Sequence, residues 1–242
     1  EEIFVSGAFG TLTMGDTDGA LDWALKDIGL GSSLADAHTS HLGYVGNDFV
    51  DSEDGDGQIA RYEYSFGDFA FGLSADIADE GGKDIFAAGA KYSVSIPAMA
   101  MRLGVGVGWQ QRAHDRNLFD DNGNPVQPAP DITDPNVPFE GEVADARGIS
   151  LDAEFDNGFR IVLNWADMGD GPEDFNYQGF EVNNLFPEEF AGIGVAYEMD
   201  DWTFAANYGR ITEEGPIYTA QEGYGIAVNY DLGGGAELQA GY

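Results

Sequence analysis

Apolar and polar residues alternate with a period of two along most of this sequence. From 60 to 66 every second residue is apolar, and Arg61, Glu63 and Ser65 fill the positions between. Successive side chains of a β-strand point to opposite faces, so this period predicts strands with one apolar and one polar face. The pattern recurs at 3–7, 11–14, 69–75, 86–94, 99–109, 149–155, 159–165, 193–197, 202–208, 224–230 and 238–242. The chain is therefore predicted to be all-β, with about 12 strands.

The connections between these predicted strands alternate between short and long. Short joins fall near residues 8–10, 67, 97, 157, 200 and 233, and long acidic ones cover 16–58, 113–145 and 169–189. Aromatic residues gather where strands meet the short joins, as Phe66 and Phe69 do. A soluble β-sandwich would bury its aromatics in mid-strand, whereas an outer-membrane barrel has one rim of tight turns and aromatic girdles. The pattern thus favours a transmembrane antiparallel β-barrel with a polar interior.

Composition and charge narrow the choice further. The 10 Lys and Arg stand against 44 Asp and Glu, a formal net charge of −34, so the chain lacks the cations that a nucleic-acid binder needs. It has no cysteine, which excludes a disulfide framework and a thiolate metal site. No apolar run reaches the length of about 18 residues that a transmembrane helix requires. Barrel strands need only about 10 alternating residues each, so a membrane location stays open.

Two motifs are more specific than the alternation. SGAFGTLTMGDTDGA, from Ser6 to Ala20, places two short strands around Ala8-Phe9-Gly10 before a long acidic loop, and YDLGGGAELQAGY, from Tyr230 to Tyr242, forms a terminal hairpin. Both resemble segments of the Gram-negative general porins, and the likeness is closest to Rhodobacter-type porins of alphaproteobacteria. The resemblance covers residues 1–242 as a single barrel domain and implies a 16-stranded porin fold.

Counted against that barrel, the chain would begin at the fourth strand and stop within the fifteenth. An open sheet would leave two unpaired edges in lipid, where unsatisfied backbone groups are costly. We therefore expect a fragment that lacks N-terminal and C-terminal strands.

Residues 16–58 are the main functional candidate, because so long a connection is more than a link in a compact barrel. We expect a short helix between Leu21 and Ile28. In the resembling family this loop folds into the lumen and narrows it. The resemblance then makes the loop's carboxylates the pore constriction, namely Asp16, Asp18, Asp22, Asp27 and Asp36. The alternative is an ordinary solvated loop.

Four cations face the same side as the polar strand positions and are candidates for the opposite pore wall: Arg61, Lys91, Arg102 and Arg160. Loop acids facing wall cations would set a transverse field that discriminates ions. A salt bridge between neighbouring strands, such as Arg61 with Asp76, is the alternative role. Many general porins carry Arg where this chain has Asp16, and that departure puts anion selectivity in doubt.

Metal and catalytic chemistry receive less support. Asp51, Asp54 and Asp56 put oxygen ligands on a flexible turn, which suits Ca²⁺, but the EF-hand spacing is absent and hydrated loop charge is the alternative. A second acidic patch, at 120–124, is of the same kind. No cofactor is required. The histidines His38, His41 and His114 fall in predicted loops, and no Ser lies beside a His on a strand face, so no enzyme is predicted.

The sequence is interpreted as a multi-pass porin of the Gram-negative outer membrane. It is expected to pass small hydrophilic solutes and ions by diffusion, to prefer cations, and to work as a homotrimer in outer-membrane lipid, without nucleic acid. The rival reading is an acidic, Ca²⁺-stabilised soluble or cell-surface β-sheet binding domain. A porin should be recovered only in detergent, whereas the binding domain should be soluble without it.

Overall fold

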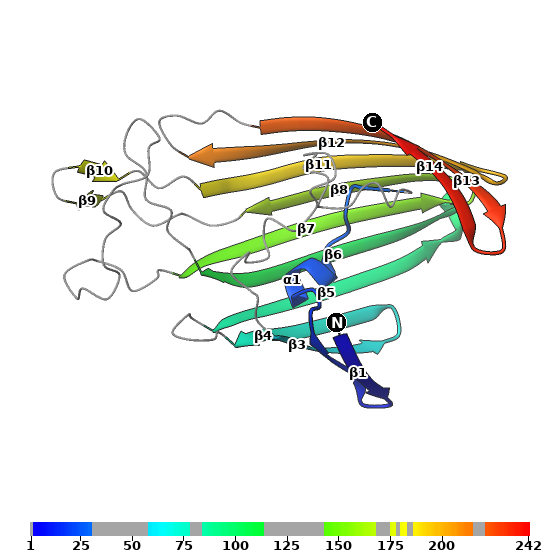
Figure 1. Ribbon diagram of the computed structural model, residues 1–242. Helices are drawn as coiled ribbons and strands as arrows, with labels where there is room; N and C mark the ends of the chain where they lie inside the picture. The colour runs from blue at the N-terminus through cyan, green and yellow to red at the C-terminus, as the bar shows by residue number, and fades with distance from the viewer. Residues whose placement is uncertain are drawn as a thin grey trace.

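The computed structural model describes residues 2–30, 58–77, 84–113, 143–167, 175–177, 180–182, 186–214 and 221–242. Within them, twelve strands form one antiparallel sheet in the order β1-β2-β3-β4-β5-β6-β7-β8-β11-β12-β13-β14. Each strand pairs with the next strand of the sheet along the chain, and the sheet curves into an open wall (Figure 1). This all-β meander confirms the strand number expected from the alternation.

The strands of the sheet are β1 (Glu2–Gly7), β2 (Gly10–Gly15), β3 (Gln58–Phe66), β4 (Phe69–Ile77), β5 (Ile85–Ile96), β6 (Met101–Ala113), β7 (Val143–Phe155), β8 (Phe159–Asp167), β11 (Phe186–Met199), β12 (Trp202–Glu214), β13 (Gln221–Gly233) and β14 (Ala236–Gly241). Two short strands, β9 (Phe175–Tyr177) and β10 (Phe180–Val182), pair with each other inside the predicted loop 169–189. The helical elements within the described ranges are α1 (Ala20–Ala24) and the 3₁₀ turn η3 (Pro97–Met99). None of the helices in the described ranges is long and apolar enough to cross a membrane.

The two faces of the sheet differ as the alternation predicts. On β7, Leu151 is 40% exposed while its neighbour Ser150 is 2% exposed. On β8, Leu163 and Asn164 show the same contrast. The face that carries the exposed apolar side chains is called the outer face here, and the opposite one the inner face. An outer face of exposed Leu, Ile, Phe and Val suits lipid, because water would penalise so continuous an apolar band.

Aromatic side chains mark the end of the sheet that carries the tight turns. Phe66 and Phe69 stack across the β3–β4 turn with ring centroids 5.7 Å apart. The ring centroids of Trp202 and Tyr230 lie 4.6 Å apart, beside the turn between β11 and β12. The opposite end carries charge on the outer face, where the Nη2 of Arg147 lies 2.6 Å from Asp167 Oδ2. An apolar band bordered by aromatic rings and by ionised groups matches the two interfaces of a membrane.

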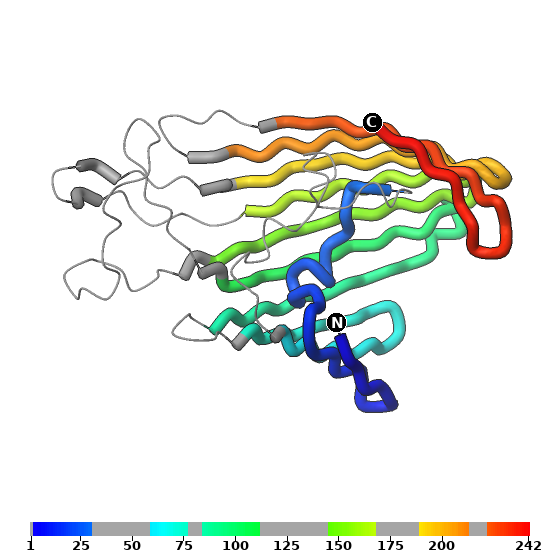
Figure 2. Tube along the Cα trace, in the orientation of Figure 1, coloured from blue at the N-terminus to red at the C-terminus, as the bar shows by residue number. Residues whose placement is uncertain are grey.

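Residues 19–30 lie against the inner face, with α1 across β4, β5 and β6 and the following chain running on toward β11 (Figure 2). The helix is shorter than the predicted 21–28, because it ends at Ala24 and the backbone is extended at Leu25. Leu21, Leu25, Ile28 and Leu30 form a buried cluster with apolar residues of the wall. The wall members of this cluster are Ala146, Val162, Ala166, Phe190, Ala196 and Ile211.

The inner face is mostly small and polar, but one region of it is apolar. Val162, Phe190 and Ile211 occupy inward positions, and each is at most 2% exposed. They are apolar because residues 19–30 cover them and exclude water from that part of the wall.

Candidate functional site

Three buried polar side chains of the wall hold the backbone of residues 19–30. Ser74 on β4 accepts a hydrogen bond from the Ala20 amide at 2.8 Å, and Ser150 on β7 accepts one from the Lys26 amide at 2.8 Å. Asn164 on β8 donates to the carbonyl oxygen of Lys26 at 2.9 Å. A segment without long regular structure leaves its own backbone groups unpaired, so these side chains satisfy groups that burial would otherwise penalise.

Inner-face glycines let this segment approach the sheet closely. A Cβ atom at Gly89 or at Gly106 would overlap a backbone carbonyl oxygen of α1, and one at Gly194 would overlap the carbonyl oxygen of Ile28. A Cβ at Gly108 would lie 2.6 Å from the Leu21 side chain. Glycine is the residue that admits such an approach, because any Cβ would push the segment away from the wall.

The acids at the start of the loop line a small cavity near the end of the wall opposite the tight turns. Asp16 and Asp18 share this cavity, of about 190 Å³, with Asp76 of β4. Arg61 of β3 lies beside it, donates to the carbonyl oxygen of Asp18 at 2.5 Å and lies 3.9 Å from its carboxylate. A predicted loop acid and a predicted wall cation thus meet in the pair of Asp18 and Arg61.

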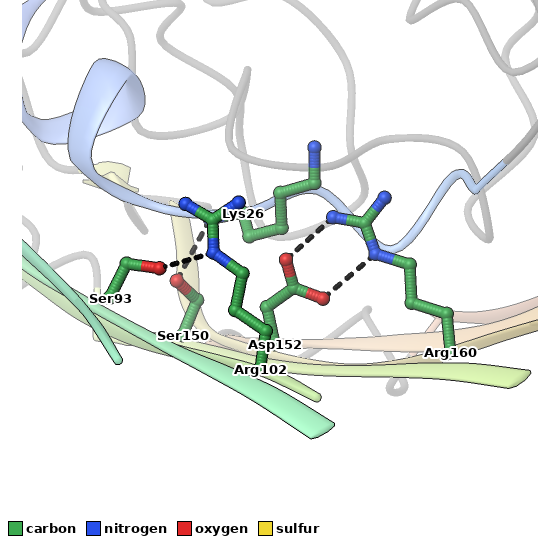
Figure 3. Close-up of polar contacts among 6 residues, drawn as sticks. All are labelled: Lys26, Ser93, Arg102, Ser150, Asp152 and Arg160. Atoms are coloured by element: carbon green, nitrogen blue, oxygen red, sulfur yellow. Dashed lines mark hydrogen bonds and ion pairs between the residues drawn. The ribbon is translucent and has the colours of Figure 1, made fainter. Parts of the chain in front are cut away.

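The other three predicted wall cations line a second cavity, of about 280 Å³, nearer the tight turns. Lys91, Arg102 and Arg160 share it with Lys26 of the loop, and the acids in its lining are Asp152 and Glu154. We call it the basic cavity. Figure 3 shows the Lys26 side chain between the guanidinium groups of Arg102 and Arg160. Its formal charge is 4 − 2 = +2.

Neighbouring side chains orient these cations. Arg160 binds Asp152 through two hydrogen bonds, from Nε at 2.8 Å and from Nη2 at 2.5 Å, across β7 and β8 (Figure 3). Arg102 donates its Nε to Ser93 Oγ at 2.7 Å. The Lys91 ammonium lies 4.0 Å from the centroid of the Trp23 ring in α1, a cation–π contact between wall and loop.

The remaining residues singled out from the sequence lie in the docked segment or outside the described residues. Asp22 and Asp27 are half-buried in the docked segment, and the Asp27 carboxylate accepts the Gly29 amide at 3.0 Å. Other candidates lie outside the described residues: Asp36, Asp51, Asp54, Asp56, the patch at 120–124, His38, His41 and His114. Within the described ranges, no group of three or more metal-binding side chains occurs.

Lys26, Ser150 and Asn164 are the parts of the site that the sequence did not reveal. Alternation places Ser150 and Asn164 on the inner face, but it gives no sign that they hold a loop. Lys26 is the one Lys or Arg within residues 16–58, and that isolated cation in an acidic loop was the available signal.

Comparison with known families decides what this sheet and its inner segment belong to. The family model described as Gram-negative porin matches residues 1–242. The chain is a member of the Gram-negative porin family. No curated protein sequence matches it significantly.

Solved porin structures share the fold at low sequence identity. A porin structure refined at 1.8 Å resolution aligns with a TM-score of 0.61 and 18% identity, over 99% of this chain and 73% of that one. A triple mutant of Rhodopseudomonas blastica porin aligns with a TM-score of 0.58 and 15% identity, over 99% and 70%. The predicted porin fold is therefore confirmed.

Family membership also places the chain in the outer membrane as a β-barrel protein. It confirms that the chain is a channel protein and not an enzyme, as expected from the histidines and serines.

Proposed function

We propose that this porin is a general diffusion channel for small hydrophilic solutes and ions, that it prefers cations, and that residues 16–58 form its constriction loop. The docking of residues 19–30 on the inner face carries this proposal. A segment that leaves the barrel rim and packs on the wall takes up cross-section that solutes would otherwise use. Its charges then act on ions at close range in partly ordered water, where interactions are stronger than in bulk.

The balance of inward charge supports a preference for cations. Counting residues 16–30 and those inward side chains of β3 to β12 whose burial the structure describes, there are nine acids and five bases, a balance of 5 − 9 = −4. The acids are Asp16, Asp18, Asp22, Asp27, Glu63, Asp76, Asp152, Glu154 and Glu198, and the bases are Lys26, Arg61, Lys91, Arg102 and Arg160. A lumen lined by excess negative charge accumulates cations and repels anions.

Reversal potentials under a KCl gradient in planar bilayers test the preference on the full-length protein. The wild type is expected to favour K⁺, and replacing Asp16, Asp18, Asp22, Asp27 and Asp36 by Asn should reduce that preference. Asp200→Asn is the control, because it removes one charge in a tight turn far from the loop, at a positive φ of 51° that Asn tolerates. Chloride preference in the wild type, or no change in the fivefold variant, would contradict the proposal.

The channel is further proposed to assemble as a homotrimer in outer-membrane lipid, as the resemblance to general porins implies. Light scattering on the detergent-solubilised protein tests this directly. A mass of three chains is expected, and a monomer at all concentrations would contradict it.

A further inference from the structure

We infer that the basic cavity is a binding site for small multivalent oxyanions, of the phosphate class, within an otherwise acidic lumen. The inference rests on the proposed channel function, because a lumen site acts on solutes that pass. It concerns a different property from cation preference. Bulk selectivity follows the summed charge of the lumen, whereas this site depends on a few oriented donors in one place.

The charge of the cavity differs from that of its surroundings. Asp152 pairs with Arg160, so among the lining residues Lys26, Lys91 and Arg102 share the cavity with one further carboxylate, Glu154. Glu63 and Asp22 act on Lys91 from outside the lining, so the excess positive charge centres on Lys26 and Arg102. Within the described residues, neither Lys26 nor Arg102 forms an ion pair. Excess positive charge in a partly enclosed space favours an anionic occupant, and a multivalent one more than chloride.

Donor geometry selects the kind of anion. Ser93 takes the Nε hydrogen of Arg102 and orients the guanidinium, and among the described residues nothing engages its two terminal nitrogens. Asp152 takes Nε and Nη2 of Arg160, and within the same residues Nη1 is left to donate. Planar guanidinium groups match the oxygen spacing of phosphate and carboxylate groups, and pre-orientation lowers the entropy lost on binding. The Lys26 side chain lines the same cavity and adds a third cationic donor; in Figure 3 its stem is drawn between the two guanidiniums and its ammonium points away from the sheet.

The cavity is partly open, and its volume suits a small solute. The cavity of about 280 Å³ lies just below the range of about 300–1,000 Å³ that holds drug-sized ligands. It lies between the docked loop and the wall, with Lys26 contributed by the loop and the other cations by β5, β6 and β8. A phosphate group therefore contacts loop and wall together.

Inorganic phosphate titrated into the detergent-solubilised, full-length protein tests the site through its ³¹P NMR line width at low ionic strength. Saturable broadening is expected, and Lys26→Gln and Arg102→Gln should each weaken phosphate affinity about tenfold, the loss expected for one charge-assisted hydrogen bond. Arg210→Gln is the matched control, because Arg210 is exposed on the outer face and its removal changes the total charge equally. Chloride at the same ionic strength should compete weakly.

Arg102→Lys separates the effect of charge from that of geometry, because lysine keeps the positive charge and lacks the planar guanidinium with its paired N–H donors. It should bind phosphate more weakly than the wild type and more tightly than Arg102→Gln. Heat-modifiable migration on gels verifies that each variant is folded. Wild-type protein without saturable broadening would overturn the inference, as would equal affinities in Lys26→Gln, Arg102→Gln and Arg210→Gln. This experiment measures phosphate binding and not conduction. A channel that conducts chloride in preference to K⁺ would therefore contradict the proposed cation preference without contradicting the phosphate site.

Discussion

At the scale of single residues, buried hydrogen bonds decide where the loop lies. Ser150 and Asn164 are 2% and 3% exposed, and both bind the backbone at Lys26. A buried carbonyl or amide without a partner costs about 1–3 kcal/mol. These two small polar side chains therefore contribute more to the shape of the lumen than their exposure suggests.

Replacing Asn164 by Leu tests whether its hydrogen bond holds the loop against the wall. The variant removes the donor to the Lys26 carbonyl, and we expect the docked segment to open more often, by a factor that corresponds to about 1–3 kcal/mol. Amide hydrogen exchange measures the opening, with the Lys26 amide as the reporter. The Ala20 amide, which Ser74 holds on β4, is the internal control and should change less. Equal exchange at Lys26 in variant and wild type would show that Asn164 does not anchor the loop.

At the scale of elements, three consecutive residues of β6 face three different environments. Gly104 lines the basic cavity, and a Cβ there would meet nothing nearer than the Asp152 Cβ at 3.5 Å. Val105 points to the outer face, and Gly106 lies beneath Ala24 of the docked loop. Substitutions at these three positions of one strand therefore test the lumen, the lipid-facing side and the loop contact separately.

Gly106→Val is expected to displace residues 19–30 from the wall, because the new side chain would occupy the position of the Ala24 carbonyl. Single-channel conductance should rise and cation preference should fall. Gly104→Ala is the control on the same face of the same strand, and its conductance should equal that of the wild type. Equal conductance in both variants would mean that the docked segment does not limit the flow of ions.

Val105→Arg tests the outer face of the same strand. A charged side chain in the apolar band should cost about 2–4 kcal/mol of stability in the membrane. Gly104→Arg places the same charge inside, near Asp152, and should cost much less. Gly104 is preferred to Ser150 as the inward position, because Ser150 is buried and accepts a hydrogen bond from the Lys26 amide. Denaturant titration of the refolded full-length protein compares the two, and similar costs would refute the assignment of faces.

At the scale of the whole molecule, charge is segregated along the wall. Asp16, Asp18 and Asp76 gather in one cavity, and three cations of the wall gather with Lys26 in another. A solute that crosses the lumen therefore meets an acidic region and a basic region in succession. The net inward charge remains negative, so the basic region is a local exception within a cation-attracting channel.

Cation preference should therefore depend on ionic strength. The screening length is about 10 Å at 0.1 M salt and about 3 Å at 1 M, so the field of the inward acids reaches less of the lumen at high salt. Reversal potentials measured at the same KCl ratio, around mean concentrations of about 0.1 M and about 1 M, should show a smaller preference in the second case. An unchanged preference would indicate selection by close contact or by width instead of by the long-range field.

The sequence by itself determined the strand number, the turn positions and the two faces of the sheet. These follow from local rules, because a strand alternates its side chains whatever lies beside it. The motifs at both ends of the chain also gave the correct family. Phe66, Leu151 and Arg160 all lie on the faces that alternation assigned to them.

Tertiary structure alone decided where the loop docks and what the inward residues do there. Lys26 meets Ser150 and Asn164 across 124 and 138 residues of sequence, and no local pattern encodes a contact of that separation. Alternation marks Gly106 and Val162 only as inward positions. Whether such a residue faces water or a packed segment depends on the path of residues 19–30, and that path is set by long-range packing and hydrogen bonding against the assembled sheet.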